Sequence, residues 1–130
     1  MVDVANKIII ERPLPTLNEY INDNRTHYHK GAKVKKNATR ICQAYIQQAI
    51  NKGLELPKLP MDLKFTWYVK NRRKDKDNIA FAKKFILDGM TSSGLIKNDG
   101  WAQIEGFTDT FIVDKNERVE IELIGANEHG

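Results

Sequence analysis

A ten-residue segment of this chain, residues 61–70 (MDLKFTWYVK), alternates strictly between apolar and polar side chains. This period of two is the pattern of a half-buried β-strand. Its buried face would be formed by Met61, Leu63, Phe65, Trp67 and Val69. The strand leads without a break into a highly charged segment, residues 71–78 (NRRKDKDN). The charged residues are therefore expected just past a strand end, where a folded scaffold supports them.

Three further segments are predicted to be strands: residues 4–11, 101–113 and 118–124. Pro13 and Pro15 end the first of them, because proline cannot donate a backbone hydrogen bond to a sheet. Residues 114–117 (DKNE) separate the last two and have turn chemistry. This spacing predicts that the last two strands form a β-hairpin.

Two segments show the apolar spacing of three and four residues that predicts helices: residues 31–51 and 78–90. Asp77 or Asn78 could cap the second helix. Residues 18–30 are polar and fit either a loop that contacts phosphate or a solvated connection. The whole pattern predicts one α+β domain over residues 1–130, a mixed β-sheet with two main helices packed mainly on one face.

Composition limits the classes to which the protein can belong. At 130 residues and 41% hydrophobic content, the chain can bury a core without disulfides or metals. No apolar run approaches the roughly 18 residues that a membrane helix needs, and the first residues lack a secretory pattern. Cys42 is the single cysteine, so no internal disulfide can form, and it is expected to pack on a helix. A reducing cytoplasm is the expected compartment.

The positive charge is concentrated in one part of the chain. Residues 21–76 carry 14 Lys and Arg against 4 Asp and Glu, a balance of +10. The remainder carries 7 against 13, or −6, which together give the net charge of +4. Lys33, Lys35, Lys36 and Arg40 fall in the first turns of the predicted long helix, where positive charge opposes the helix dipole. The distribution favours a polyanionic partner on one face.

Three aspartates are the candidate metal ligands. Asp75 and Asp77 are two positions apart, so in extended backbone they would share a face and could bind one cation together. Asp99 follows the second predicted helix and would join them if that helix packs back along the strand. Magnesium prefers such carboxylate oxygens together with water and phosphate oxygens. Lys84 could then place its ammonium on the phosphate.

Other interpretations of these residues remain open at this stage. Asp77 could simply cap its helix, and residues 98–100 (NDG) could be a turn. A calcium loop fits badly, because Ala80 and Ile86 stand where that loop needs glycine and glutamate. A zinc site would have only the His27 and His29 pair to draw on. An acid-x-lysine nuclease element at residues 62–64 competes with the exposed face of the predicted strand.

Residues 72–99 (RRKDKDNIAFAKKFILDGMTSSGLIKND) resemble the core motif of the RusA-type Holliday junction resolvases, which are mostly phage-encoded endonucleases. That motif has a basic run, then Asp-x-Asp-Asn, a helix with a lysine and Asp-Ala-Leu, and a glycine-containing turn that ends in an acid. The resemblance places the family's metal-binding acids on Asp75, Asp77 and Asp99, and its asparagine on Asn78. Asp88 matches the helix aspartate.

The position of the family's lysine depends on the alignment. It falls on Lys84 if three residues are inserted after Asn78, whereas without the insertion Phe81 occupies the position. Neighbouring Lys83 remains an alternative.

The resemblance implies a magnesium-dependent homodimer, with manganese as a possible substitute, that nicks two opposing strands of a four-way DNA junction. Asp75, Asp77, Asp99 and Lys84 would be its catalytic residues. The cations that would hold DNA phosphates without reading bases are Arg72, Arg73, Lys74, Lys33, Lys35, Lys36 and Arg40. The alternative is a non-catalytic DNA-binding module that uses the same basic face, and nicking with a divalent ion would distinguish the two.

Overall fold

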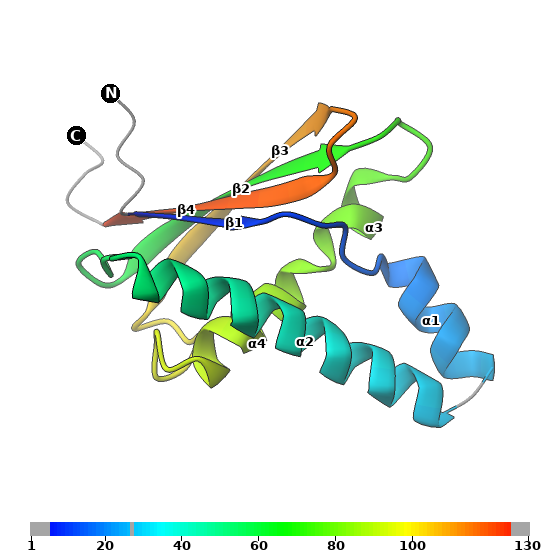
Figure 1. The fold of residues 1–130 in the computed structure, drawn as a ribbon, viewed down its shortest axis with the longest axis horizontal. Coiled ribbons are helices and arrows are strands. Elements are labelled where there is room, and N and C mark those ends of the chain that lie inside the picture. The colour runs from blue at the N-terminus through cyan, green and yellow to red at the C-terminus, as the bar shows by residue number, and fades with distance from the viewer. Residues whose placement is uncertain (1–5, 27, 126–130) are drawn as a thin grey trace.

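Four strands and four helices make up the part of the chain that the structure describes. The computed structural model describes residues 6–26 and 28–125, with the side chains of all of these except residues 23–26, 28 and 29. The elements in chain order are β1 (Lys7–Ile10), α1 (Leu17–Thr26), α2 (Tyr28–Asn51), β2 (Met61–Val69), α3 (Lys76–Ala80), α4 (Lys83–Ser92), β3 (Ile104–Val113) and β4 (Arg118–Gly125). The strands form one twisted sheet, and α1, α2 and α4 lie together beneath it (Figure 1).

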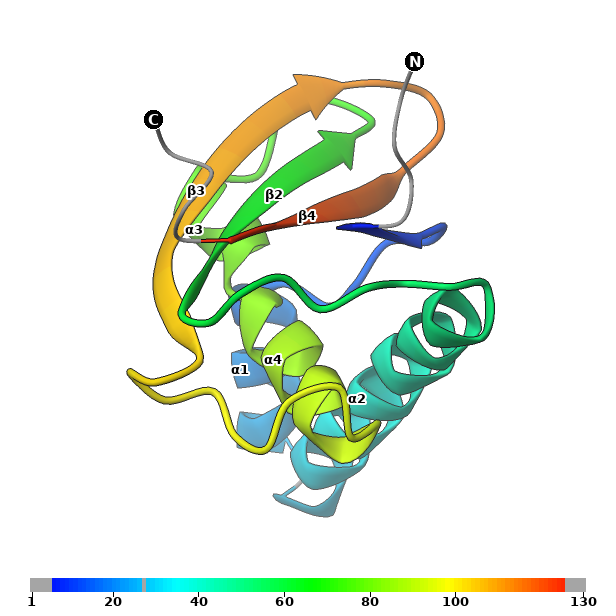
Figure 2. The same cartoon turned by 90° about the vertical axis from the view of Figure 1, so that its left-hand side faces the viewer.

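The sheet is mixed, with the strand order β1-β4-β2-β3. β4 runs antiparallel to both β1 and β2, whereas β3 runs parallel to β2. The connection from β2 to β3 therefore passes through α3 and α4, as parallel strands require. β3 pairs only with β2 and forms one edge of the sheet, as Figure 2 shows.

The predicted hairpin between the last two strands is wrong. β4 pairs with β2, and residues 114–117 carry the chain across the end of β2 instead of reversing it beside β3. The backbone N–H of Asp114 donates to the carbonyl of Val69 at 2.8 Å, which fastens the crossing. The turn residues predicted correctly that the chain reverses direction. The choice of β2 as the partner of β4 depended instead on burial of the apolar side chains of β4. Val119, Ile121 and Leu123 of β4 are almost fully buried, as an internal strand requires.

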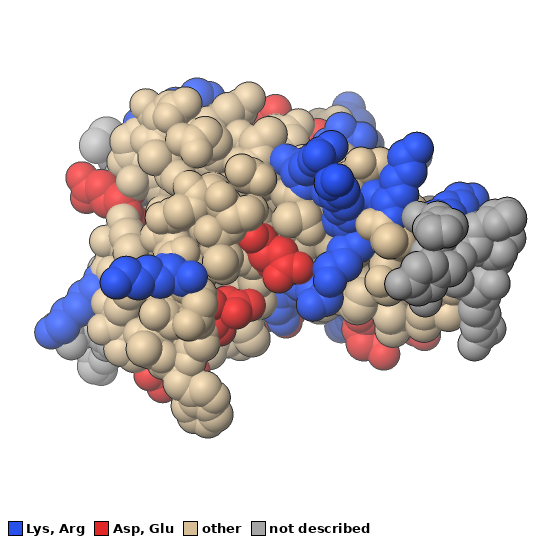
Figure 3. Space-filling view, turned by 90° about the horizontal axis from the view of Figure 1, so that it is seen from below, with Lys and Arg blue, Asp and Glu red and all other residues tan. Residues whose placement is uncertain are grey.

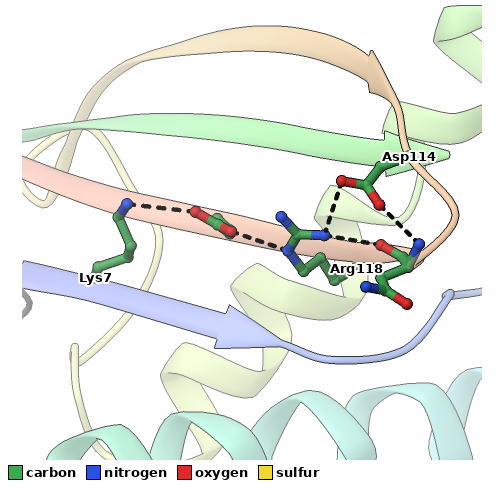
Figure 4. A network of polar contacts seen from close by, with 5 residues as sticks. Lys7, Asp114 and Arg118 are labelled. Atoms are coloured by element: carbon green, nitrogen blue, oxygen red, sulfur yellow. Dashed lines mark hydrogen bonds and ion pairs between the residues drawn. The ribbon is translucent and has the colours of Figure 1, made fainter.

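A network of polar side chains holds this crossing together (Figure 4). Arg118 donates to the Asn116 carbonyl at 2.9 Å and to Glu120 at 3.0 Å, and Glu120 also binds Lys7 at 3.3 Å. The pKa of Asp114 is lowered, first by the Asn116 backbone N–H and also by the Arg118 charge. The contact with Glu120 raises the pKa of Arg118. The network has a structural role at the β3–β4 connection.

The core lies between the sheet and the helices, as the sequence pattern predicts. Residues 61–69 form β2 with the predicted alternation, and Met61, Leu63 and Phe65 are fully buried. Cys42 of α2 is buried against α4, and burial raises the pKa of its thiol to about 12. The α+β prediction is confirmed.

The prediction that residues 18–30 are irregular is wrong, because α1 forms from Leu17. Thr16 and Glu19 cap this helix reciprocally. The Thr16 N–H donates to Glu19 Oε1 at 2.9 Å, and the Glu19 N–H donates to Thr16 Oγ1 at 3.3 Å. This Thr-x-x-Glu capping box is readable in the sequence. The side chains of His27 and His29, the candidate zinc ligands, lie outside the described residues.

The second predicted helix is divided into α3 and α4. Hydrogen bonds from Ala82 to Ile79 and from Phe85 to Ala82 span three residues, so the chain is wound more tightly at the junction. The strand predicted from residue 101 begins at Ile104, because the Gly100 carbonyl accepts from Gln103 and Ile104 in a preceding turn.

Candidate active site

The pair Asp75 and Asp77 lies where the sequence predicts, just beyond the end of β2. Asp75 occupies the N-cap position of α3, but its side chain makes no capping hydrogen bond. Asp77 lies in the first turn, and its Oδ1 accepts from the Asn78 N–H at 2.9 Å. Both residues are exposed. Capping of the helix therefore does not account for the Asp75 carboxylate, which is free to bind a ligand.

These two carboxylates line a pocket of about 570 Å³. Its apolar wall is formed by Val69, Ile79, Phe111, Ile112 and Val113, and cationic residues at its rim are Arg72, Lys74 and Lys76. Lys76 Nζ stands 5.8 Å from the centre of the Phe111 ring. Paired carboxylates with adjacent cations can hold a hard divalent ion and a phosphate oxygen at one place.

Asn78 has a structural role that the sequence did not reveal. It is buried, and its Oδ1 accepts from the backbone N–H of Asn18 at 2.8 Å. This bond ties the start of α1 to α3. Lys74 also reaches Glu19 of α1 at 3.9 Å, a long ion pair that contributes little. The motif asparagine thus fixes α1 beside the two carboxylates.

Asp99 lies at the other end of β2 and β3. It lines a separate pocket with Gly100, Trp101 and residues 104–107 at the start of β3. The pocket of Asp75 and Asp77 instead adjoins residues 111–113 at its end. The strand residues that line the two pockets are at least four positions apart, roughly 13 Å or more along a strand. Within the described residues, no three His, Cys, Asp or Glu side chains gather as a metal site.

The two candidate lysines differ sharply. Lys83 Nζ donates to Asp109 Oδ2 at 2.7 Å and stands over the rings of Phe107 and Phe65, at 4.7 and 5.2 Å from their centres. Asp109 also accepts from the Trp67 indole at 2.8 Å. Lys83 is therefore bound to the edge strand. Lys84 is exposed, and no described residue engages its ammonium.

The predicted DNA-binding cations lie on two segments that flank α1. Arg72, Arg73 and Lys74 are exposed on the loop after β2. On α2, Lys33, Lys36 and Arg40 are exposed and Lys35 is half-buried. α1 contacts both α2 and α3. Figure 3 shows Lys and Arg side chains gathered toward the end of the molecule where α1 and α2 meet.

Sequence reasoning missed two residues near the sites. Trp101 is 98% exposed beside Asp99, and its place as the first residue of the predicted strand over residues 101–113 gave no sign of this. Asp109 neutralises Lys83, and only the parallel pairing of β2 and β3 reveals that partnership. The alternative nuclease element at residues 62–64 gains no support, because it lies within β2, where Lys64 is exposed on the sheet surface.

The fold, the paired carboxylates and the basic surface are the features expected of one class of protein, a small nuclease that acts on DNA phosphates. Comparison with protein families identifies the family within that class. The family model described as Endodeoxyribonuclease RusA matches residues 11–124. The chain therefore belongs to the RusA family of endodeoxyribonucleases, which resolve Holliday junctions. No curated protein matches the chain.

Membership in this family decides between the two functions that the basic face allowed. The protein is a nuclease that acts on branched DNA, and RusA nucleases depend on a divalent metal. Within the described residues, no helix is long and apolar enough to cross a membrane.

Proposed function

We propose that this protein is a magnesium-dependent homodimer that resolves four-way DNA junctions by paired nicks. The observation that carries the proposal is the pair of exposed carboxylates, Asp75 and Asp77, in a pocket rimmed by cations. Their oxygen donors fit magnesium, and manganese has the same preference for carboxylate oxygens. When bound, the metal would polarise the phosphate and lower the pKa of the attacking water.

We propose Asp99 as the third ligand, contributed by a second subunit. Within one chain, Asp99 and the other two acids lie at opposite ends of β3. An antiparallel pairing of β3 with β3 of a second copy would place the start of one strand beside the end of the other. The unpaired outer side of β3 supports this arrangement, because an exposed sheet edge is a template for another strand.

The required register is the one that uses the whole strand. To bring residues 104–107 of one copy opposite residues 111–113 of the other, the two-fold axis must pass near Thr108 and Asp109. This is the middle of β3, so nearly all ten residues of the strand would pair. Two equivalent sites then follow from the symmetry, which suits a junction with approximate two-fold symmetry and two opposing strands to cut.

The cations of the chain would hold and orient the DNA. Arg72 and Lys74 line the pocket of the carboxylates, and together with neighbouring Arg73 they would bind phosphates on either side of the scissile bond. The cations of α2 would hold an arm of the junction further away. Lys84 is the proposed catalytic lysine, since its free ammonium could stabilise charge on the phosphate. Lys83 would instead position α4 on β3 through Asp109.

Nicking of defined DNA tests this function. Labelled four-way, forked and linear duplexes would be incubated with the protein in magnesium or in a chelator, and the nicks mapped on each strand. We expect paired, symmetric nicks in the four-way junction with magnesium and none with the chelator. Asp77→Asn should abolish nicking and leave junction binding largely intact. Magnesium-dependent cleavage by a pure Asp77→Asn protein would contradict the assignment.

A further inference from the structure

Trp101 is the most exposed large apolar side chain among the described residues, at 98%, whereas Trp67 is 4% exposed. A defined turn presents it. The Gly100 carbonyl accepts from the N–H groups of Gln103 and Ile104 at 3.1 and 3.0 Å, and the Gly100 N–H donates to the Asn98 side chain. The indole thus projects from a fixed turn beside Asp99, with no described residue to cover it.

A hollow with apolar walls lies at the opposite end of the same edge strand. It is the pocket of about 570 Å³ that contains Asp75 and Asp77, and Phe111, Ile112 and Val113 of β3 form part of its wall. Ile112 and Val113 are 40% and 48% exposed. The strand therefore carries a projecting aromatic residue at its start and an unfilled hollow at its end.

A two-fold axis turns this arrangement into a self-complementary surface. In an isologous interface, a contact from the start of β3 to the end of β3 in the partner occurs twice. The turn keeps Trp101 beside residues 104–107. The pairing that aligns these residues with residues 111–113 of a second copy also places the indole at that copy's hollow. A projecting aromatic residue that enters a partly apolar pocket is the usual anchor of a stable interface.

We infer that Trp101 of each subunit docks into the pocket of its partner, and that this contact sets Asp99 beside the partner's Asp75 and Asp77. The inference rests on the dimer of the proposed function and assigns its anchor. The occupant of the hollow is a second copy of this chain. The indole would lie against the wall formed by Phe111, Ile112 and Val113 and leave the two carboxylates open to metal and DNA.

Self-association without DNA or metal is the first test. Trp101→Ala should weaken the dimer at least about tenfold in sedimentation equilibrium, with Trp101→Phe intermediate. Ile9→Ala is the matched control, since Ile9 is 39% exposed on β1, the other edge of the sheet, and should leave the dimer unchanged. Both side chains are exposed, so circular dichroism should show the native fold in all three variants. A Trp101→Ala protein that dimerises like the wild type would overturn the inference.

Fluorescence distinguishes a protein partner from a DNA base. The chain has two tryptophans, so the difference between wild-type and Trp101→Phe spectra isolates Trp101. We expect that emission to lie to the blue in the concentrated protein and to shift to the red on dilution, without DNA. A blue shift that occurs only on addition of junction DNA would mean that the indole stacks on a base, and would overturn the inference.

The nicking assay tests the proposed function independently of the Trp101 contact. If the wild type nicks junctions with magnesium while the Trp101 contact fails these tests, the nuclease assignment stands and only the anchor is wrong. If the wild type does not nick at all, the proposed function fails whatever the oligomeric state.

Discussion

The two ends of the β2–β3 strand pair differ in the cations and in the apolar side chains that they carry. The end where both strands finish is hollow, rimmed by cations and carries two exposed carboxylates. The end where β3 starts carries the carboxylates of Asp99 and Glu105 beside the exposed indole of Trp101. In the proposed dimer, each end would contribute part of one metal site. The parallel direction of the two strands keeps the parts apart within one chain.

This separation has a simple physical cause. After β2, the chain must return to the start of the sheet before it can form a parallel neighbour, and α3 and α4 make that return. A residue just after β2 and a residue just before β3 are therefore at opposite ends by topology. In the proposed dimer, a second copy whose β3 runs antiparallel to the first brings the unlike ends together.

Mixing two inactive variants tests most directly whether the two ends, from different subunits, form one site. We expect Asp77→Asn and Asp99→Asn each to lack detectable nicking. In a mixed dimer, one site collects both changes and the other is intact, so a re-associated equal mixture should recover about one quarter of the wild-type sites. The measurement is single-strand nicking of a four-way junction. If each site lies within one subunit, the mixture stays inactive.

Metal binding by the same mixture of variants tests the shared site without a measurement of catalysis. Manganese titration by electron paramagnetic resonance should detect bound ion in the mixture and little in either variant alone. An equal mixture of two separate Asp77→Asn preparations is the control and should not recover binding.

Removal of charge at the hollow end should weaken DNA binding. We expect the double change Arg72→Ala and Arg73→Ala to lower junction affinity roughly tenfold, and to reduce the salt slope of log K by about two. Lys52→Ala removes an exposed cation that lies beyond the C-terminus of α2, and should change neither quantity. Affinity would be measured by fluorescence anisotropy at several salt concentrations. An unchanged slope would show that these arginines do not contact phosphates.

The helix layer that joins the two ends can be loosened at Gly89. A Cβ at this position would lie 3.0 Å from Cys42 Cβ and 3.1 Å from the Gln43 backbone N, tighter than most packed contacts, so α2 or α4 would have to shift by a few tenths of an ångström. Gly89→Ala should therefore destabilise the protein by about 1–3 kcal/mol, measured by urea unfolding. Ser92→Ala, at an exposed position of the same helix, should have little effect. A neutral Gly89→Ala would show that α2 and α4 can move apart without cost.

Burial of Cys42 at the same contact leads to a smaller prediction, which concerns the pH dependence of protein stability. Burial raises the pKa of Cys42 from 9.0 to about 12, so the folded state holds the thiol proton more tightly than the unfolded state does. Stability from this group is full below about pH 9 and declines as the pH rises toward 12. Between pH 8 and 10, the wild type should lose about 1 kcal/mol more than Cys42→Ala does. Equal losses would show that the thiol is open to solvent.

The local part of the site could be predicted from the sequence. The alternation over residues 61–69 specified β2, and therefore the position of Asp75 and Asp77 beyond its end. The capping box at Thr16 and Glu19 was also present in the sequence, although residues 18–30 were predicted to be irregular. These features depend on residues that are close together in the chain, so they can be predicted from the sequence.

Three features depended on contacts between residues far apart in the chain. The position of β4 beside β2 was decided by the burial of Val119, Ile121 and Leu123, and the turn before β4 could not reveal it. The ion pair of Lys83 with Asp109 required β3 to lie next to β2. The position of Asp99 depended in addition on the direction of β3, which runs parallel to β2.

The sequence by itself determined a local arrangement: a strand, then a basic loop and a pair of acids just beyond the strand end. Only the tertiary structure decided that the third acid lies at the far end of the sheet beside an uncovered tryptophan. The reason is that side-chain periodicity fixes which face of a strand is buried, whereas the order and direction of strands follow from how the whole apolar surface is covered.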